Sequence, residues 1–192
     1  RAMVEAMDTE LGRLIAAIPQ PVLDDTLIVF VGDNGTSREG TITPFNPDHA
    51  KGTVYEGGVN VPLIMVGPGI PVNDKCKGIA STTDLFATIC EVMGIPQTTA
   101  TDSTSLVPYF SDPNQPNIQP YVYTEWFDPN GFGLKTTWNR AIRDWRFKLI
   151  QRFDQTVDPF NPYESEFYDL NNDPFEQFPL NYPPLPPLHE IG

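Results

Sequence analysis

Three polar side chains, Asp33, Asn34 and Lys51, have the residue types that suit chemistry on an anion. Carboxylate and amide oxygens are ligands that Ca²⁺ and Mg²⁺ prefer, and a lysine ammonium beside such a cation attracts an anion. Asp33 and Asn34 directly follow an apolar run, and Lys51 stands in a glycine-rich stretch. Taken alone, Asp33-Asn34-Gly35 also fits a plain tight turn and Lys51 fits a surface lysine, so both interpretations stay open at this point.

Two apolar runs, residues 26–31 and 61–66, are the predicted strands that position these side chains. Their continuous apolar character predicts strands that are buried on both faces of a parallel sheet. Ligands of open α/β sheets bind at the carboxyl ends of strands, which is where Asp33 and Asn34 stand. The runs therefore indicate an α/β layer architecture with a candidate divalent-cation site at the end of the first strand.

Helices are predicted before and after these strands. Residues 1–18 carry apolar side chains at helical spacing, and Pro19 ends that helix. A second helix begins at Ser81, which forms a capping pattern with Asp84. The apolar stripe of the first helix comprises Met3, Met7, Leu11, Leu14, Ile15 and Ile18, and the predicted buried face of the second comprises Leu85, Ile89 and Val92.

The last part of the chain has a different character. Residues 96–120 are rich in Thr, Ser, Asp and Pro, and short segments with strand patterns follow them. These segments predict a meander of antiparallel strands, at residues 121–127, 140–143, 146–153 and 166–170. We therefore divide the chain into an α/β part, residues 1–118, and a small antiparallel-sheet subdomain with a proline-rich tail, residues 119–192.

The composition excludes some classes of function. The chain carries 25 acidic and 12 basic residues, a net charge of −13, which argues against a nucleic-acid partner. No apolar run reaches the roughly 18 residues of a membrane-spanning helix. Cys76 and Cys90 are too few for a disulfide framework, so we expect free thiols, with a bridge between the two as the alternative.

Several motifs in order along the chain resemble one known family. They are Val31-Gly-Asp-Asn-Gly35, Lys51-Gly-Thr-Val-Tyr-Glu-Gly-Gly58, Val61-Pro62, Ala141-Ile-Arg-Asp-Trp-Arg-Phe-Lys-Leu-Ile150 and Glu166-Phe-Tyr-Asp-Leu170. Together they look like the C-terminal portion of a type I, formylglycine-dependent sulfatase of the alkaline phosphatase superfamily. The resemblance implies an alkaline-phosphatase-like α/β sandwich, with residues 1–118 as the C-terminal half of its main sheet domain.

The resemblance also implies roles for individual residues. Asp33 and Asn34 match ligands of a single metal ion, usually Ca²⁺, with Mg²⁺ as the alternative. Lys51 matches the lysine that contacts the sulfate group. His49 is a candidate to reach the sulfate or the leaving group, although a loop histidine without a site role is the alternative. Glu56 is interpreted as structural, because a buried glutamate there needs hydrogen-bond partners.

The implied substrate is a small-molecule or carbohydrate sulfate ester. Trp126 and Trp138 are candidates to stack on its sugar or aryl group, and packing of both rings into the small sheet is the alternative. The family implies a periplasmic or secreted protein. We also expect a further N-terminal segment, or a second copy of the chain, to cover the sheet that residues 1–118 begin.

One departure from the family concerns the nucleophile. Sulfatases make formylglycine from Cys or Ser in a Cys/Ser-x-Pro/Ala-x-Arg motif, and neither Cys76 nor Cys90 lies in such a motif. The isolated chain is therefore expected to be inactive. Two other functions stay open: a non-catalytic fragment or degenerate relative that binds a metal or ligand, and a phosphodiester or phosphonate hydrolase of the same superfamily.

Overall fold

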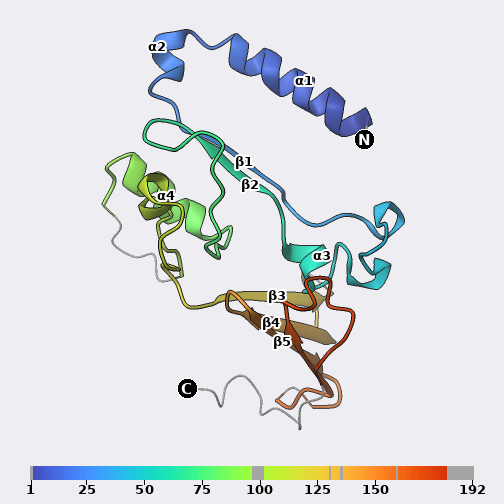
Figure 1. Cartoon of the computed structure of the whole chain (residues 1–192). Helices are drawn as coiled ribbons and strands as arrows, with labels where there is room; N and C mark the ends of the chain where they lie inside the picture. Colours follow the sequence, from blue (N-terminus) through green and yellow to red (C-terminus); the bar gives the residue numbers. More distant parts are fainter. Residues whose placement is uncertain (1, 97–101, 130, 135, 159, 181–192) are drawn as a thin grey trace.

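The computed structural model describes residues 2–96, 102–129, 131–134, 136–158 and 160–180. Figure 1 shows a long first helix, a two-stranded ribbon below it and a larger sheet at the opposite end. The helical elements are α1 (Ala2–Ala16), α2 (Gln20–Leu23), the short 3₁₀ turns η1 (Arg38–Gly40) and η2 (Pro47–His49), α3 (Glu56–Val59), α4 (Asp84–Val92) and α5 (Pro108–Ser111). The strands are β1 (Ile28–Val31), β2 (Leu63–Val66), β3 (Val122–Asp128), β4 (Thr137–Arg143), β5 (Phe147–Asp154) and β6 (Glu164–Asp169).

Helix α1 forms where the sequence predicts it and ends before Pro19. Its apolar stripe, however, has no cover within the part of the chain that the structure describes, because α1 contains no buried residue. Met3 is 85% exposed and Leu14 is 63% exposed. In Figure 1 the helix lies apart from both sheets. The helix is therefore stabilised by local interactions such as the Glu10–Arg13 ion pair one turn apart, not by packing.

The two predicted strands form, but two expectations about them are wrong. Strands β1 and β2 pair with each other in antiparallel register, with Ile28 opposite Val66 and Val31 opposite Leu63. Neither strand is fully buried, and Ile64 is 54% exposed. Their apolar runs predict burial, but among the described residues the ribbon has only two strands, so no further strand or packed layer covers its faces.

Helix α4 forms near the predicted position, but neither its cap nor its buried face is the predicted one. The helix begins at Asp84, and its N-cap residue Thr83 makes no side-chain cap bond. The Ser81 amide donates to the Asp84 carboxylate at 2.7 Å, which is one of the two bonds of a capping box. The buried side chains of the helix are Asp84, Ala87 and Thr88, whereas Ile89 is 45% exposed. The cause is polar. Asp84 and Thr88 accept hydrogen bonds from the amides of Thr104 and Leu106, which hold that loop against this face. Val92 is exposed like Ile89, and Leu85 is half-buried.

The C-terminal strands form the predicted meander, in the order β3-β4-β5-β6 with every neighbouring pair antiparallel. The turn between β4 and β5 is closed by the Asp144 amide, which donates to the Phe147 carbonyl at 3.0 Å. The same turn sets the register that places Ala141 opposite Ile150. Figure 1 shows this sheet next to α3.

The main hydrophobic core lies between this sheet and the glycine-rich segment before α3. It contains Val54 and Tyr55 together with sheet residues such as Ile150, which is fully buried. The core thus joins residues from both of the parts into which we divided the chain, and the division at residues 118 and 119 stays a prediction. The proline-rich tail lies outside the described residues.

Cys76 and Cys90 are both free thiols, as expected. Cys76 is exposed and Cys90 is half-buried. Among the described helices none has the length and apolar character needed to cross a membrane.

Candidate active site

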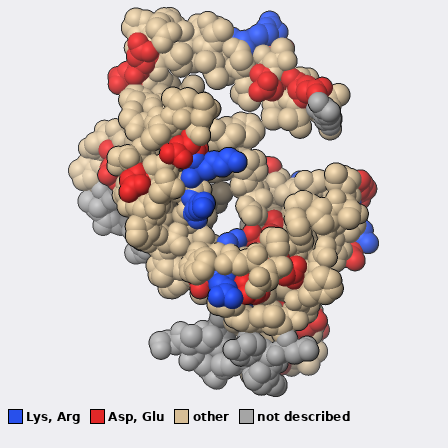
Figure 2. Space-filling model, in the orientation of Figure 1, with Lys and Arg blue, Asp and Glu red and all other residues tan. Residues whose placement is uncertain are grey.

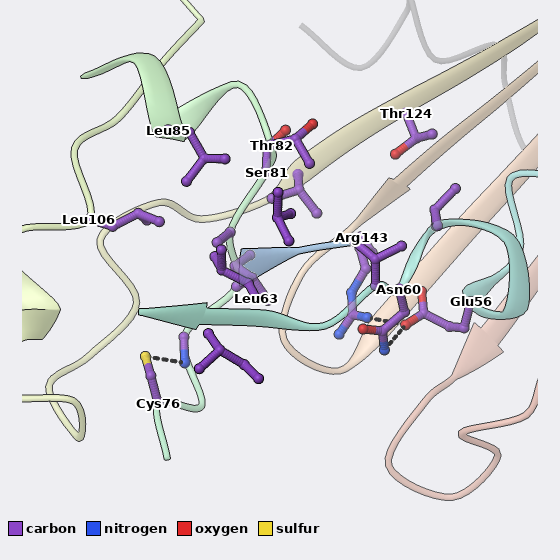
Figure 3. Close-up of a pocket in the computed structure, with 18 of the residues that line it drawn as sticks. Glu56, Asn60, Leu63, Cys76, Ser81, Thr82, Leu85, Leu106, Thr124 and Arg143 are labelled. Carbon is purple, nitrogen blue, oxygen red and sulfur yellow. Dashed lines mark hydrogen bonds and ion pairs between the residues drawn. The ribbon is translucent and has the colours of Figure 1, made fainter. Parts of the chain in front are cut away.

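A large open cavity brings the predicted site residues together. It measures about 1160 Å³ and is lined by the β1–β2 ribbon, by the loops around it and by strands β3 and β4. Asp33, Asn34 and Lys51 all line this cavity. Figure 3 shows part of its wall, with Asn60, Glu56 and Arg143 at one end.

Asp33 and Asn34 stand just beyond the end of β1. The ladder continues for one more bond, in which the Gly32 amide donates to the Pro62 carbonyl at 3.0 Å. Beyond it the two side chains face each other, and the Asn34 amide donates to the Asp33 carboxylate. Asp33 is exposed and Asn34 is half-buried. Both are thus accessible oxygen-bearing groups at one point, which fits part of the shell of a hard cation.

Glycines hold the segment after Asn34 against the turn that contains α3. The Gly35 amide donates to the Gly58 carbonyl at 2.9 Å. A Cβ atom at Gly35 would lie 1.9 Å from the Gly57 carbonyl oxygen, and one at Gly58 would lie 2.4 Å from the Thr53 carbonyl oxygen. Only glycine allows so close an approach of two backbones. The close contact between the two backbones therefore requires glycine at positions 35 and 58.

Lys51 is joined to the same segment through its backbone. Its amide donates to the Thr36 carbonyl at 2.9 Å. Lys51 is exposed, with its side chain at the cavity wall. The two bonds, Lys51 to Thr36 and Gly35 to Gly58, both lie directly after Asn34 in the chain. They set the position of Lys51 relative to Asn34 without any side-chain contact.

Glu56 anchors the α3 turn to the C-terminal sheet and is buried, with 7% exposure. Its carboxylate accepts from Lys148 at 2.9 Å, from Arg143 at 2.6 Å and from the Asn60 amide at 3.0 Å. Lys148 is 1% exposed and also pairs with the buried Glu176 at 2.9 Å. Glu176 in turn accepts from the Glu56 backbone amide at 2.6 Å. Burial raises the pKa of Glu176, against the lowering effect of Lys148. Below, these residues are called the Glu56 cluster (Glu56, Asn60, Arg143, Lys148 and Glu176).

His49 lies beside the site but not in the cavity wall. Its ring stacks on Tyr55, with the ring centroids 3.5 Å apart and the planes 7° from parallel. Its Nδ1 atom is buried and finds no hydrogen-bond partner in the described part of the chain. Burial lowers the pKa of His49, although Glu166 acts in the opposite direction. A catalytic role for His49 stays a prediction, and the structure shows a packing role.

Tyr55 connects this stack to the sheet. Its hydroxyl donates to Glu166 at 2.6 Å, and Tyr168 donates to the same oxygen of Glu166 at 2.6 Å. Arg152 pairs with Glu166 at 2.7 Å and also contacts the Tyr55 hydroxyl. Burial alone would raise the pKa of Glu166, but the hydrogen bonds from Tyr168, Tyr55 and Arg152 outweigh it and lower that pKa. Glu166 therefore stays ionised as a fixed acceptor.

The structure separates the two candidate tryptophans. Trp126 pairs with Asn139 across β3 and β4, packs against the core and lines the cavity. Trp138 occupies the neighbouring position of β4, so its side chain points to the other face of the sheet. There it stacks between Phe127 and Phe153, with ring centroids 5.5 Å and 5.6 Å away. The structure brings Trp126 to the site and does not bring Trp138 there.

Sequence reasoning missed most of the Glu56 cluster. Lys148 and Glu176 lie 92 and 120 residues from Glu56, so no local pattern links them. The one available signal was the need of a buried glutamate for partners. Within the described ranges no group of three or more His, Cys, Asp or Glu side chains has the arrangement of a metal site. The assignment of Asp33 and Asn34 as metal ligands therefore stays a prediction.

Comparisons with known proteins agree on one family. The family model described as Sulfatase matches residues 2–95. Arylsulfatase K of Canis lupus familiaris is 28% identical over 171 residues, covering 82% of this chain and 31% of the relative. The chain thus spans about a third of the length of the curated relatives it matches.

Two solved structures share the fold with this chain. A 2-O GAG sulfatase is 26% identical with a TM-score of 0.66, covering 86% of this chain and 34% of that one. A phosphonate monoester hydrolase of Agrobacterium radiobacter is 28% identical with a TM-score of 0.69, covering 92% of this chain and 35% of that one. The fold is α/β with antiparallel sheets and is alkaline-phosphatase-like. With the family model and the named relatives, these likenesses show that the chain belongs to the sulfatase family of the alkaline phosphatase superfamily, as its C-terminal portion.

Proposed function

We propose that this chain forms the metal- and sulfate-binding side of an enzyme that hydrolyses sulfate esters. The observation that supports the proposal is the meeting of Asp33, Asn34 and Lys51 at one cavity. Main-chain hydrogen bonds and glycine contacts between their two segments hold this arrangement. Oxygen ligands of a cation beside an exposed ammonium suit a sulfate ester, whose negative charge is shared by the non-bridging oxygens of its sulfuryl group.

Sulfatases generally use a metal ion and a formylglycine residue. We propose Ca²⁺ at Asp33 and Asn34, with Mg²⁺ as the alternative, and with further ligands supplied from outside the described residues. When bound, the cation would polarise a sulfate oxygen. Lys51 holds the sulfate group and offsets charge that develops on it during transfer. Removing one such preorganised donor commonly costs a hundred- to a thousandfold in rate, about 3–4 kcal/mol.

A carbohydrate sulfate is the substrate class that we favour. The 2-O GAG sulfatase structure covers most of this chain, and Trp126 gives the cavity an aromatic face on which a sugar ring can pack. A phosphonate monoester is the second candidate, because the phosphonate monoester hydrolase is as similar to this chain. The Asp-Asn pair favours the sulfatase, since two-metal phosphatases of the superfamily tend to carry Asp-His there.

Hydrolysis by the full-length gene product tests the proposal. We expect metal-dependent turnover of 4-nitrophenyl sulfate that exceeds turnover of a phenylphosphonate monoester. Lys51→Ala should lower kcat about a hundredfold or more, and Asp33→Ala should abolish the response to added Ca²⁺. Arg13→Gln, an exposed change far from the cavity, serves as the matched control. Full activity of Lys51→Ala, or faster turnover of the phosphonate, would contradict the proposal.

A periplasmic or secreted location is part of the same proposal and is supported by the family alone. Fractionation of cells that express the full-length protein checks it. Recovery in the cytosolic fraction would refute it.

A further inference from the structure

Two members of the Glu56 cluster are accessible from the cavity, and the other three are buried. The buried members are Glu56, Lys148 and Glu176. Asn60 is exposed, Arg143 is half-buried, and both line the cavity. Figure 3 shows both side chains beside Glu56 at one end of the cavity wall. The cluster therefore presents one amide and one guanidinium group to a molecule that occupies this end of the cavity.

The Asn60 side chain has a fixed orientation. Glu56 pairs with both Lys148 and Arg143, so its carboxylate has no hydrogen to donate and can only accept. The Asn60 atom that lies 3.0 Å from Oε2 of Glu56 is therefore the nitrogen Nδ2, and the oxygen Oδ1 is left without a hydrogen bond to any described residue. The backbone is held as well, because the Asn60 amide donates to the Glu56 carbonyl at 2.9 Å. Asn60 thus offers a preorganised acceptor at the cavity wall.

Arg143 offers a donor at the same place. Its Nη1 atom donates to Oε2 of Glu56 at 2.6 Å, the oxygen to which Asn60 also donates. Its Nε atom donates to the Asp144 carbonyl at 3.0 Å, whereas Nη2 forms no hydrogen bond with the described part of the chain. Because both side chains bind one oxygen atom, the open acceptor of Asn60 and the open donor of Arg143 are neighbours.

This donor and acceptor do not form a charged site. The cluster contains two carboxylates, Glu56 and Glu176, and two cations, Lys148 and Arg143, so their charges offset one another. Figure 2 shows basic and acidic side chains close together along the border of the central hollow of the molecule. An anion therefore gains little at Asn60 and Arg143, whereas an uncharged group that both donates and accepts can bond to both side chains.

The same face of the C-terminal sheet continues this polar, uncharged surface. Arg143 lies opposite Val122, and Thr124 and Trp126 follow at two-residue steps along β3, so Arg143, Thr124 and Trp126 point to one face. These three side chains all line the cavity. The Thr124 hydroxyl and the Trp126 ring thus extend the surface that begins at Asn60 and Arg143.

We propose that Asn60 and Arg143 determine substrate specificity by binding an uncharged hydroxyl or acetamido group in the alcohol part of the ester. That group donates to Oδ1 of Asn60 and accepts from Nη2 of Arg143. The inference rests on the proposed function, in which Lys51 binds the sulfate. A site arranged to hydrogen-bond a substrate group discriminates against substrates that lack this group, because its own polar atoms then lose a partner.

Steady-state kinetics of the full-length gene product tests this inference with esters that all carry a single sulfate. The substrates are glucose 6-O-sulfate, which has hydroxyl groups, N-acetylglucosamine 6-O-sulfate, which adds an acetamido group, and 4-nitrophenyl sulfate, which has neither. For Asn60→Ala we expect the ratio of kcat/KM for a sugar to kcat/KM for the aryl sulfate to fall about fivefold, the contribution of one hydrogen bond. Arg143→Lys keeps a cation beside Glu56 but loses the second nitrogen donor, and it should lower the same ratio. The sugar with the larger fall identifies the bound group as hydroxyl or as acetamido.

The ratio separates this inference from a purely structural role and from the proposed function. Each ratio is taken on one enzyme preparation, so a smaller amount of folded protein does not change it. Asn171→Ala is the matched control, because this asparagine is exposed and is not among the cavity-lining residues, and it should keep the wild-type ratio. An unchanged ratio in Asn60→Ala or in Arg143→Lys, even where all three rates fall together, refutes the inference and leaves the proposed function intact. If the wild-type enzyme hydrolyses none of the three esters, the proposed function fails as well.

Discussion

Replacement of the buried Lys148 is the sharpest test of how the site is held. Lys148→Met preserves most of the side-chain volume but leaves two carboxylates, Glu56 and Glu176, without the ammonium that lies 2.9 Å from each. Lys148 and Glu176 are each 1% exposed, so water cannot replace the lost partner. Breaking a buried pair in this way costs about 3–5 kcal/mol. That is a large share of the roughly 5–15 kcal/mol of a whole domain.

Urea unfolding followed by tryptophan fluorescence measures the loss. Arg13→Gln is the matched control, because its pair with Glu10 is exposed, at 74% and 66% for the two side chains, and such pairs contribute at most about 0.5 kcal/mol. The triple variant Glu56→Gln/Lys148→Met/Glu176→Gln removes the stranded charges and should recover much of the stability. A loss below about 1 kcal/mol in Lys148→Met would refute the buried-pair argument.

The pH dependence of the same variant gives a second readout. Burial raises the pKa of Glu176 above its ordinary value of 4.5, and Lys148 lowers it. Without Lys148 the folded-state pKa rises further, so Glu176 takes up a proton on folding. A group of this kind makes the folded state more stable as the pH falls toward the unfolded-state pKa. As the pH falls from neutral to about 4.5, the free energy of unfolding of Lys148→Met should therefore increase relative to that of wild type.

Three further predictions follow from the site. Gly35→Ala should lower the free energy of unfolding by about 1–3 kcal/mol, because its Cβ would lie 1.9 Å from a backbone oxygen. The control Gly12→Ala has open space around it and should raise the free energy of unfolding by up to about 1 kcal/mol. Equal unfolding midpoints for the two variants would contradict the close-packing argument. Burial lowers the pKa of His49 below 6.5, so the unfolded chain takes up a proton at higher pH than the folded chain, and stability should fall as the pH drops below about 6.5. His49→Phe keeps a ring stacked on Tyr55 and should lose less stability over this pH range, as measured by thermal unfolding at two pH values. The same pH slope in wild type and variant would contradict this prediction. The isolated chain should show no metal-dependent hydrolysis of an aryl sulfate, because neither of its cysteines lies in a formylglycine motif, and measurable turnover by the purified chain would overturn this.

Local signals in the sequence predicted the elements well. The apolar runs located β1 and β2, and the turn at Asp144 located the β4–β5 hairpin. The Ser81-x-x-Asp84 pattern located α4 to within three residues, since the helix begins at Asp84. Each of these signals acts over a few residues, through strand propensity, capping or turn geometry. For the same reason they placed Asp33 and Asn34 at the end of a strand.

The sequence did not show which strands pair with each other, or to which face of a sheet a side chain points. An apolar run shows that a strand needs cover but not which segment pairs with it, so the antiparallel pairing of β1 and β2 was missed. The face of a side chain depends on strand register, and a shift of one residue reverses it. Trp126 and Trp138 therefore looked equivalent in the sequence, although they lie on opposite faces of the sheet.

The Glu56 cluster makes the C-terminal sheet part of the support of the candidate site. Arg143 and Lys148 come from β4 and β5, and they hold the carboxylate at the start of α3. The same short helix contains Gly57 and Gly58, whose backbones touch Gly35 one residue after the proposed metal ligand Asn34. A displacement of the sheet therefore moves Glu56, then the glycine turn, then the loop that carries the oxygen ligands. The position of those ligands depends on residues more than 80 positions away in the chain, since Arg143 and Glu56 are 87 apart.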